Sequence, residues 1–161
     1  MSLRLSKLIA TAFGTGYVPM APGTAGSIIG MIFLYVFNLV LMQLFELDIY
    51  IVYSGIVLII FTFYIGGFAI KKVHEEWKHD SGKIVIDEVI GVFITLFASP
   101  LDWRYYLTGL VLFRVFDIWK PLYIRKIDNM NSNWSVMLDD VLAGVYSFIL
   151  LRLMILYFPI I

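Results

Sequence analysis

Five carboxylates lie inside or beside apolar segments of this chain, where charge is costly to bury. They are Asp87, Glu88, Asp117, Asp139 and Asp140. The chain has no cysteine, so a metal site built from these side chains would consist of oxygen ligands. Such ligand sets favour Mg²⁺ or Mn²⁺ over zinc or copper. We therefore predict that all five belong to a site for a hard divalent cation.

A simpler interpretation is that these acids are charges at helix ends. Acidic residues in a first turn complement the helix dipole, and Asp117 can pair with Arg114, three residues earlier. Adjacent helical residues also point about 100° apart, so Asp139 and Asp140 cannot both face one point. We expect one member of each adjacent pair to bind the cation while the other supports it or caps the helix.

Three basic residues, Arg114, Lys120 and Arg125, lie close to Asp117 in the sequence. Arginine binds phosphate oxygens bidentately, and lysine binds them as a point charge. Beside a metal site, these residues predict a clamp for a phosphoryl group, with Asp117 and Asp140 as further catalytic groups. The alternative is a polybasic segment attracted to anionic lipid.

Glycine and proline are frequent between residues 13 and 27, and an apolar helix is expected to start near Thr24. Exposed N–H groups at a helix N-terminus form an anion site, so Thr24 is a candidate for binding substrate; capping the helix is its simpler role. The run lacks the Gly-Lys-Ser/Thr ending of a P-loop. Gly26 and Gly30 offer a small-residue face for packing against another helix.

Composition indicates that these groups lie in a membrane protein. Of the 161 residues, 61% are hydrophobic and 15% are charged, whereas soluble domains have about 45–50% apolar and about 25% charged residues. The net charge is zero, which argues against nucleic acid as a partner. We predict an all-α integral membrane helical bundle that forms a single domain over residues 1–161 and is compatible with an oligomer.

Five apolar runs predict about five membrane-embedded helices. Ala25–Phe45 and Ile49–Ile70 carry no charge, and each has the roughly 20 residues needed to cross about 30 Å of hydrocarbon. Three further runs are shorter or contain charges: Ile84–Ala98, Tyr105–Trp119 and Met137–Phe158.

Loop charges predict which side of the membrane holds the charged groups. Short loops rich in lysine and arginine stay in the cytoplasm. The N-terminal segment and the loops at 71–83 and 120–126 contain several lysines and arginines, whereas the opposite turns hold Glu46 with Asp48 and Asp102 with Arg104. With the N-terminus inside, the five carboxylates, Arg114 and the glycine- and proline-rich run all fall at the cytoplasmic helix ends.

Four runs of this sequence resemble the phosphatidylglycerophosphatase A family, bacterial membrane phosphatases of phospholipid synthesis. They occur in the family's order: Ala21–Ser27, Ile86–Gly91, Phe113–Pro121 with Ile124, Arg125 and Asp128, and Val136–Gly144. The resemblance implies Mg²⁺-dependent hydrolysis of phosphatidylglycerophosphate to phosphatidylglycerol and inorganic phosphate. It implies a multi-pass protein of the cytoplasmic (inner) membrane. Two kinds of nucleophile are compatible with these residues for that reaction: a water molecule, or the carboxylate of Asp117 or Asp140.

The competing class is a small membrane transporter or an assembly subunit with a cation site at the interface. Transporters place their polar groups near the bilayer midplane, often on broken helices. Here the charged groups gather at one end, and Arg152 is the main exception. The position of the charges therefore favours the enzyme.

Overall fold

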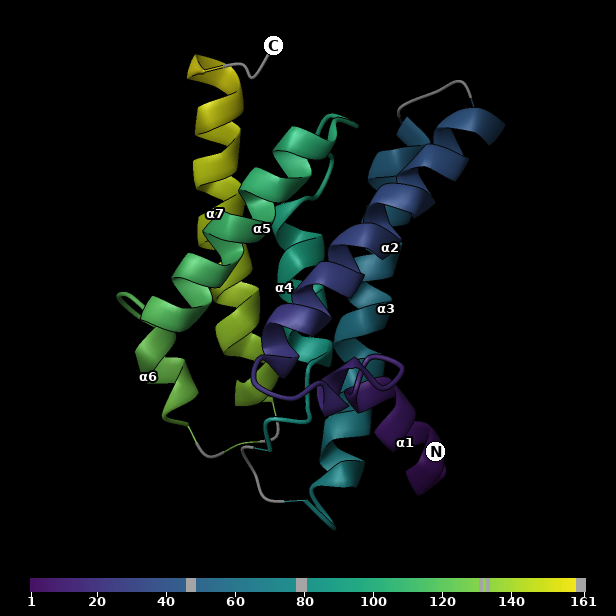
Figure 1. Ribbon diagram of the computed structural model, residues 1–161, viewed down its shortest axis with the longest axis vertical. Helices are drawn as coiled ribbons and strands as arrows, with labels where there is room; N and C mark the ends of the chain where they lie inside the picture. The colour runs from purple at the N-terminus through teal and green to yellow at the C-terminus, as the bar shows by residue number, and fades with distance from the viewer. Residues whose placement is uncertain (46–48, 78–80, 131, 133, 159–161) are drawn as a thin grey trace.

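The chain folds into helices connected by short loops. The structure is a computed structural model that describes residues 1–45, 49–77, 81–130, 132 and 134–158. These residues contain no strand, so the all-α prediction is confirmed. The elements in chain order (Figure 1) are α1 (Leu3–Ala10), the short 3-10 helix η1 (Thr15–Tyr17), α2 (Pro22–Leu44), α3 (Ile49–Val73), α4 (Ile86–Thr95), α5 (Trp103–Trp119), α6 (Ile124–Asp128) and α7 (Ser135–Tyr157).

Three helices are long and apolar enough to cross a bilayer. They are α2, α3 and α7, of 23, 25 and 23 residues. Most of the apolar side chains on α2 and α3 face outward, as expected for a surface in contact with hydrocarbon. The prediction of an integral membrane bundle is therefore supported by the helix lengths and by the apolar exterior.

The predicted count of five spans is not confirmed, because α4 is too short. Its 10 residues rise only about 15 Å at 1.5 Å per residue, and the chain leaves the helix before the Ser99-Pro100 turn. Nearly all of α4 is buried, since it contacts α2, α3, α5 and α7. The apolar run in α4 thus packs against protein rather than lipid. The 17 residues of α5 also fall short of a full span.

The helices alternate in direction, so that one end of the bundle collects five helix termini. Helices α2, α4 and α7 begin at this end, whereas α3 and α5 end there (Figure 1). Two short helices at the same end were not predicted from the sequence. Helix α1 packs on α3, and α6 packs on α7. The backbone N–H of Val85 donates to the carbonyl of Ala10 at 2.9 Å, which joins the end of α1 to the start of α4.

Part of the charge pattern used for orientation falls outside the described residues. This applies to Glu46 and Asp48 in one turn and to Lys78 in another. The turn that holds Asp102 and Arg104 is described, and there the two side chains form an ion pair at 2.6 Å. Asp102 also caps α5 by accepting from the N–H of Arg104 at 2.9 Å.

Glycines bring the backbones of the central helices close together. A Cβ on Gly144 of α7 would lie 2.6 Å from the carbonyl oxygen of Gly91 on α4. A Cβ on Gly26 would lie 2.8 Å from the Val85 side chain, and one on Gly30 would lie 3.3 Å from Val89. The predicted packing role of Gly26 and Gly30 is confirmed. The contact between Gly91 and Gly144 sets the separation of α4 and α7.

We predict that Gly144→Ala destabilises the protein by about 1–3 kcal/mol, the usual cost of overpacking a tight contact. The higher helix propensity of alanine offsets at most about 1 kcal/mol of this loss. The measurement is the unfolding midpoint in detergent. Gly82→Ala is the matched control, because no atom lies within 4 Å of the added Cβ. A Gly144→Ala protein as stable as the wild type would contradict the proposed helix contact.

Candidate functional site: an acidic cavity at the helix ends

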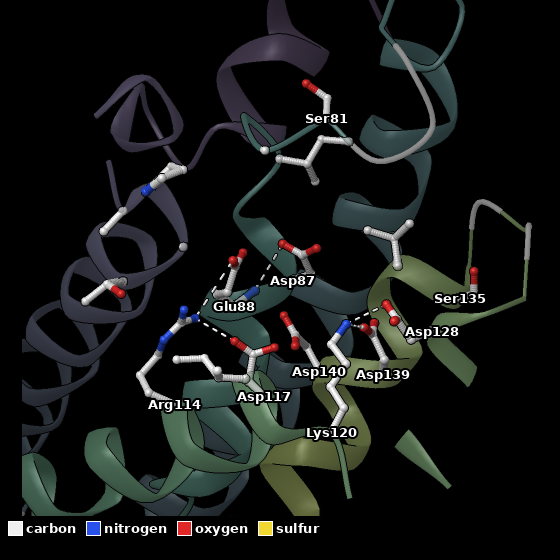
Figure 2. Close-up of a pocket in the computed structure, with 18 of the residues that line it drawn as sticks. Ser81, Asp87, Glu88, Arg114, Asp117, Lys120, Asp128, Ser135, Asp139 and Asp140 are labelled. Atoms are coloured by element: carbon white, nitrogen blue, oxygen red, sulfur yellow. Dashed lines mark hydrogen bonds and ion pairs between the residues drawn. The ribbon is translucent and has the colours of Figure 1, made fainter. Parts of the chain in front are cut away.

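A cavity of about 810 Å³ opens where these helix ends meet. Its wall comes from the start of α2, the start of α4, the end of α5 and the start of α7, with residues from the loop before α4 and from the end of α6. Figure 2 shows acidic and basic side chains pointing into this space from several helices. The charged groups that the sequence analysis assigned to one end of the bundle therefore share one cavity.

Three carboxylates form the centre of the cavity. Oxygens of Asp87, Glu88 and Asp140 all lie within 4.8 Å of one another. Asp87 and Asp140 are 8% and 3% exposed. At about 5 Å and an effective dielectric constant of about 20, two negative charges repel by on the order of 3 kcal/mol. This cluster is therefore costly unless protons or a cation reduce its charge.

The close approach of α4 and α7 creates the cluster. Asp87 and Glu88 occupy the first turn of α4, and Asp140 lies in the second turn of α7, one turn before Gly144. Because Gly91 and Gly144 let the two backbones touch, the carboxylates at the helix starts converge. Gly23 has a similar role on the other side, since a Cβ there would lie 2.1 Å from Oε1 of Glu88.

Several buried oxygen atoms in the cavity have no hydrogen-bond partner among the described residues. They are Oε2 of Glu88, Oδ1 of Asp139 and Oδ1 of Asp140. Buried polar atoms are rarely left unsatisfied in native proteins. Carboxylate oxygens without donors, held a few ångströms apart, are the donor set that a hard divalent cation takes. The residues therefore fit such an ion.

Arg114 lies on the α2 side of the cluster. Its Nη1 contacts Oδ2 of Asp117 at 2.7 Å and Oε1 of Glu88 at 3.9 Å. The same atom lies 3.4 Å from the hydroxyl of Ser27. The pairing of Arg114 with Asp117 is the one that the simpler interpretation of the acids offered, and Figure 2 shows the guanidinium pointing toward both acids. Asp117 thus orients Arg114 toward the cavity.

Lys120 lies on the opposite side of the cluster. Its Nζ donates to Oδ2 of Asp139 at 2.9 Å and also to Asp128. Burial alone lowers the pKa of the Lys120 ammonium, but the hydrogen bonds to Asp128 and Asp139 outweigh burial and raise that pKa above its ordinary value. Lys120 therefore remains charged at neutral pH. It ends α5 in a left-handed conformation just before Pro121.

The five predicted carboxylates all line the cavity, but they divide into two groups. Asp87, Glu88 and Asp140 form the cluster, whereas Asp117 and Asp139 each hold a basic side chain. In the adjacent pair on α7, one acid joins the cluster and its neighbour holds Lys120. The pair on α4 differs from the expected division, because Asp87 and Glu88 both contribute an oxygen to the cluster.

Of the predicted substrate-binding residues Thr24 and Arg125, only Thr24 lines the cavity. Thr24 lines the cavity, but it does not cap α2, because the N-cap is Ala21. Arg125 is exposed and does not line the cavity; its guanidinium donates to the carbonyl of Trp119 at 3.3 Å. Asp128 and Ser27 were missed as site residues. Both belong to the sequence runs that carry the family resemblance, and this was the available signal.

Negative charge is in excess in the cavity. The described lining contains six carboxylates but two basic side chains, Arg114 and Lys120. Four negative charges therefore remain at neutral pH when every group is ionised. A phosphate, itself an anion, would be repelled from this space unless further positive charge were present.

We predict that Asp140→Asn stabilises the protein by about 1–3 kcal/mol when EDTA is present, because the amide removes a charge from a buried, repelling cluster. The unfolding midpoint in detergent measures the effect. Asp102→Asn is the control: Asp102 pairs with Arg104 at the opposite end of the bundle, so this change should give no gain. An Asp140→Asn protein less stable than the wild type in EDTA would show that the carboxylates do not repel.

Comparisons with known proteins identify the family of this chain. The phosphatidylglycerophosphatase A family model matches residues 8–155. A candidate phosphatidylinositol-3-phosphatase of Bacteroides thetaiotaomicron is 41% identical over 156 residues, or 91% of each chain.

Phosphatidylglycerophosphatase A of Escherichia coli K12 is 38% identical over 87% of this chain and 77% of the relative. The protein of that name in Haemophilus influenzae is 38% identical over 88% and 83%. No solved structure gives a significant match. A family match over nearly the whole chain, with such relatives, shows that this membrane protein belongs to the phosphatidylglycerophosphatase A family and is a phosphatase.

Proposed function

We propose that this protein removes the terminal phosphate of phosphatidylglycerophosphate, giving phosphatidylglycerol and inorganic phosphate in a Mg²⁺-dependent reaction. The observation that carries the proposal is the carboxylate cluster of Asp87, Glu88 and Asp140, flanked by Arg114 and Lys120 at the ends of membrane helices. Two relatives named phosphatidylglycerophosphatase A support the choice of substrate.

The cluster carboxylates are the proposed Mg²⁺ ligands, with Asp117 and Asp139 as further acids that contact the basic groups. The unpartnered oxygens of Glu88 and Asp140 support this assignment. Bound Mg²⁺ supplies positive charge that offsets the excess of carboxylates and polarises the phosphoryl oxygens. Mg²⁺ prefers carboxylate and phosphate oxygens together, which suits a cavity built to receive a phosphate ester.

Arg114 and Lys120 are the proposed phosphate-binding residues. They reach the cavity from opposite sides, and each is held by a carboxylate, Asp117 or Asp139. Side chains that are already oriented lose less entropy when substrate binds. Their positive charges stabilise the negative charge on the non-bridging oxygens during phosphoryl transfer. Thr24, in the first turn of α2, lines the cavity and is a further proposed donor to the same phosphate.

The attacking group is water or a carboxylate. Oδ1 of Asp139 is buried and unpartnered, and Asp139 is not among the proposed cation ligands, so this atom can accept a proton from an attacking water. If the reaction passes through an acyl phosphate, the attacking atom would be a carboxylate oxygen of Asp140 that does not bind the cation. Asp117 is less suited to attack, because Arg114 already binds its Oδ2. Phosphate-monoester hydrolysis requires barrier lowering of about 20 kcal/mol or more, so several groups must act together.

We propose that the cavity faces the cytoplasm from the inner membrane. The basic residues near it support this orientation, since cytoplasmic loops retain lysine and arginine. Among the described residues, Lys71, Lys72 and Lys83 lie near the helix ends on the cavity side, whereas Asp102 and Arg104 lie on the other.

The transporter alternative is disfavoured by where the charges lie. Charged groups of a transporter would line a path near the bilayer midplane, but the described cavity lies at one end of the bundle. Arg152, on the far half of α7, donates to the carbonyl of Phe97 and lies 5.1 Å from the Phe148 ring. Arg152 is thus held by local contacts and does not extend the acidic cavity.

The test is phosphate release by the purified protein from phosphatidylglycerophosphate and phosphatidylinositol 3-phosphate, with Mg²⁺ and with EDTA. We expect release from phosphatidylglycerophosphate with Mg²⁺, and loss of at least about 100-fold in EDTA. Asp140→Asn and Asp117→Asn should lower turnover by a similar factor. Arg125→Gln is the matched control, since Arg125 does not line the cavity; its turnover should stay within about threefold of the wild type.

Three outcomes would contradict parts of the proposal. Full activity in EDTA would show that the reaction does not require a divalent metal ion. A turnover number of Asp140→Asn equal to that of the wild type would show that the Asp140 carboxylate has no role in catalysis. Faster phosphate release from phosphatidylinositol 3-phosphate than from phosphatidylglycerophosphate would favour the substrate that appears in the name of the Bacteroides thetaiotaomicron relative.

A further inference from the structure

One part of the cavity lining is apolar and exposed at the surface of the bundle. Met20 precedes α2 and Ile118 lies near the end of α5; they are 101% and 72% exposed, yet both line the cavity. Elsewhere the lining carries polar side chains, among them Ser81 and Ser135, which Figure 2 shows away from Arg114. The cavity is therefore bordered by apolar surface on one side and by polar surface on another.

The apolar border continues along α5. Four exposed side chains on this helix are spaced by four, four and three residues, which places them on one face. They are Leu107, Val111, Val115 and Ile118, with exposed fractions of 42%, 60%, 49% and 72%. Helix α5 belongs to a bundle with an apolar exterior, so this face contacts hydrocarbon. We call these four residues the α5 stripe; it ends at the cavity.

The dimensions of the α5 stripe suit an acyl chain. From Leu107 to Ile118 the helix rises about 16 Å, which is close to half of the roughly 30 Å hydrocarbon thickness. The guanidinium of Arg114 reaches Asp117, the residue before Ile118, so a phosphate held by Arg114 lies at the level of the cavity end of the stripe. An acyl chain that runs from this level toward the bilayer centre passes along the stripe.

We propose that the α5 stripe binds an acyl chain of the substrate lipid while its phosphate lies in the cavity. The lipid then reaches the site laterally from the bilayer, between the start of α2 and the end of α5. The inference rests on the proposed function, namely that the substrate is a membrane lipid phosphate. Burial of methylene groups against the stripe contributes binding energy that a chain-free phosphomonoester lacks.

Contact with bulk lipid alone is the competing explanation, because other helices expose apolar side chains as well. Val57 on α3 is 65% exposed and does not line the cavity. It therefore serves as a matched control for Ile118, which has a similar exposure and a different position.

The test uses the absence of cysteine from this chain. Ile118→Cys and Val57→Cys proteins are labelled with a bulky neutral maleimide. The value of kcat/KM is then measured with dioctanoyl and dibutanoyl phosphatidylglycerophosphate below their micelle-forming concentrations. We expect the wild type to favour the dioctanoyl lipid. Labelling Ile118→Cys should lower the dioctanoyl-to-dibutanoyl ratio about tenfold, the effect of losing contact with about two methylene groups. Labelling Val57→Cys should leave the ratio unchanged.

An unchanged ratio after labelling Ile118→Cys would overturn the inference, as would a wild type with no chain-length preference. An equal loss on both lipids also leaves the ratio unchanged and would show that the label merely blocks the cavity. A wild type inactive on both lipids would instead contradict the proposed function, and the inference would fall with it.

Discussion

The site depends on the contact between α4 and α7 at Gly91 and Gly144. Their backbones touch there, which no larger residue allows. This contact brings two helix starts together, and each start carries an adjacent pair of acids. The resulting cluster of buried carboxylates is unfavourable by electrostatics alone. The helix packing therefore holds these carboxylates in mutual repulsion at the place where a cation would relieve it.

The two basic residues complete this arrangement. Arg114 and Lys120 are too few to neutralise the six carboxylates that line the cavity. They are instead positioned by two of these acids, Asp117 and Asp139. The acids and bases thus have distinct proposed tasks: the cluster suits a cation, and Arg114 and Lys120 are the proposed phosphate-binding groups. The cavity opens beside the exposed apolar face of α5, as the proposed action on a lipid headgroup requires.

The sequence was most informative where physical constraints are local. Uninterrupted apolar length predicted α2 and α3, and alternation of helix direction placed the charged residues at one end. The prediction of a membrane span was wrong for α4, because a short apolar run packed inside a bundle has the same composition as part of a membrane span. The sequence also placed Arg125 in the site. The direction of a side chain beyond Pro121 depends on the turn and on α6, which hydrophobic periodicity does not reveal.

The central claim is that a divalent cation and a phosphate bind together in the carboxylate cavity. Electron paramagnetic resonance of Mn²⁺ added to the protein with inorganic phosphate tests this most directly. The account predicts protein-bound Mn²⁺ with hyperfine coupling to ³¹P, lost in Asp140→Asn and retained in Arg125→Gln. Mn²⁺ that stays free, or bound Mn²⁺ with no coupling to ³¹P, would contradict it.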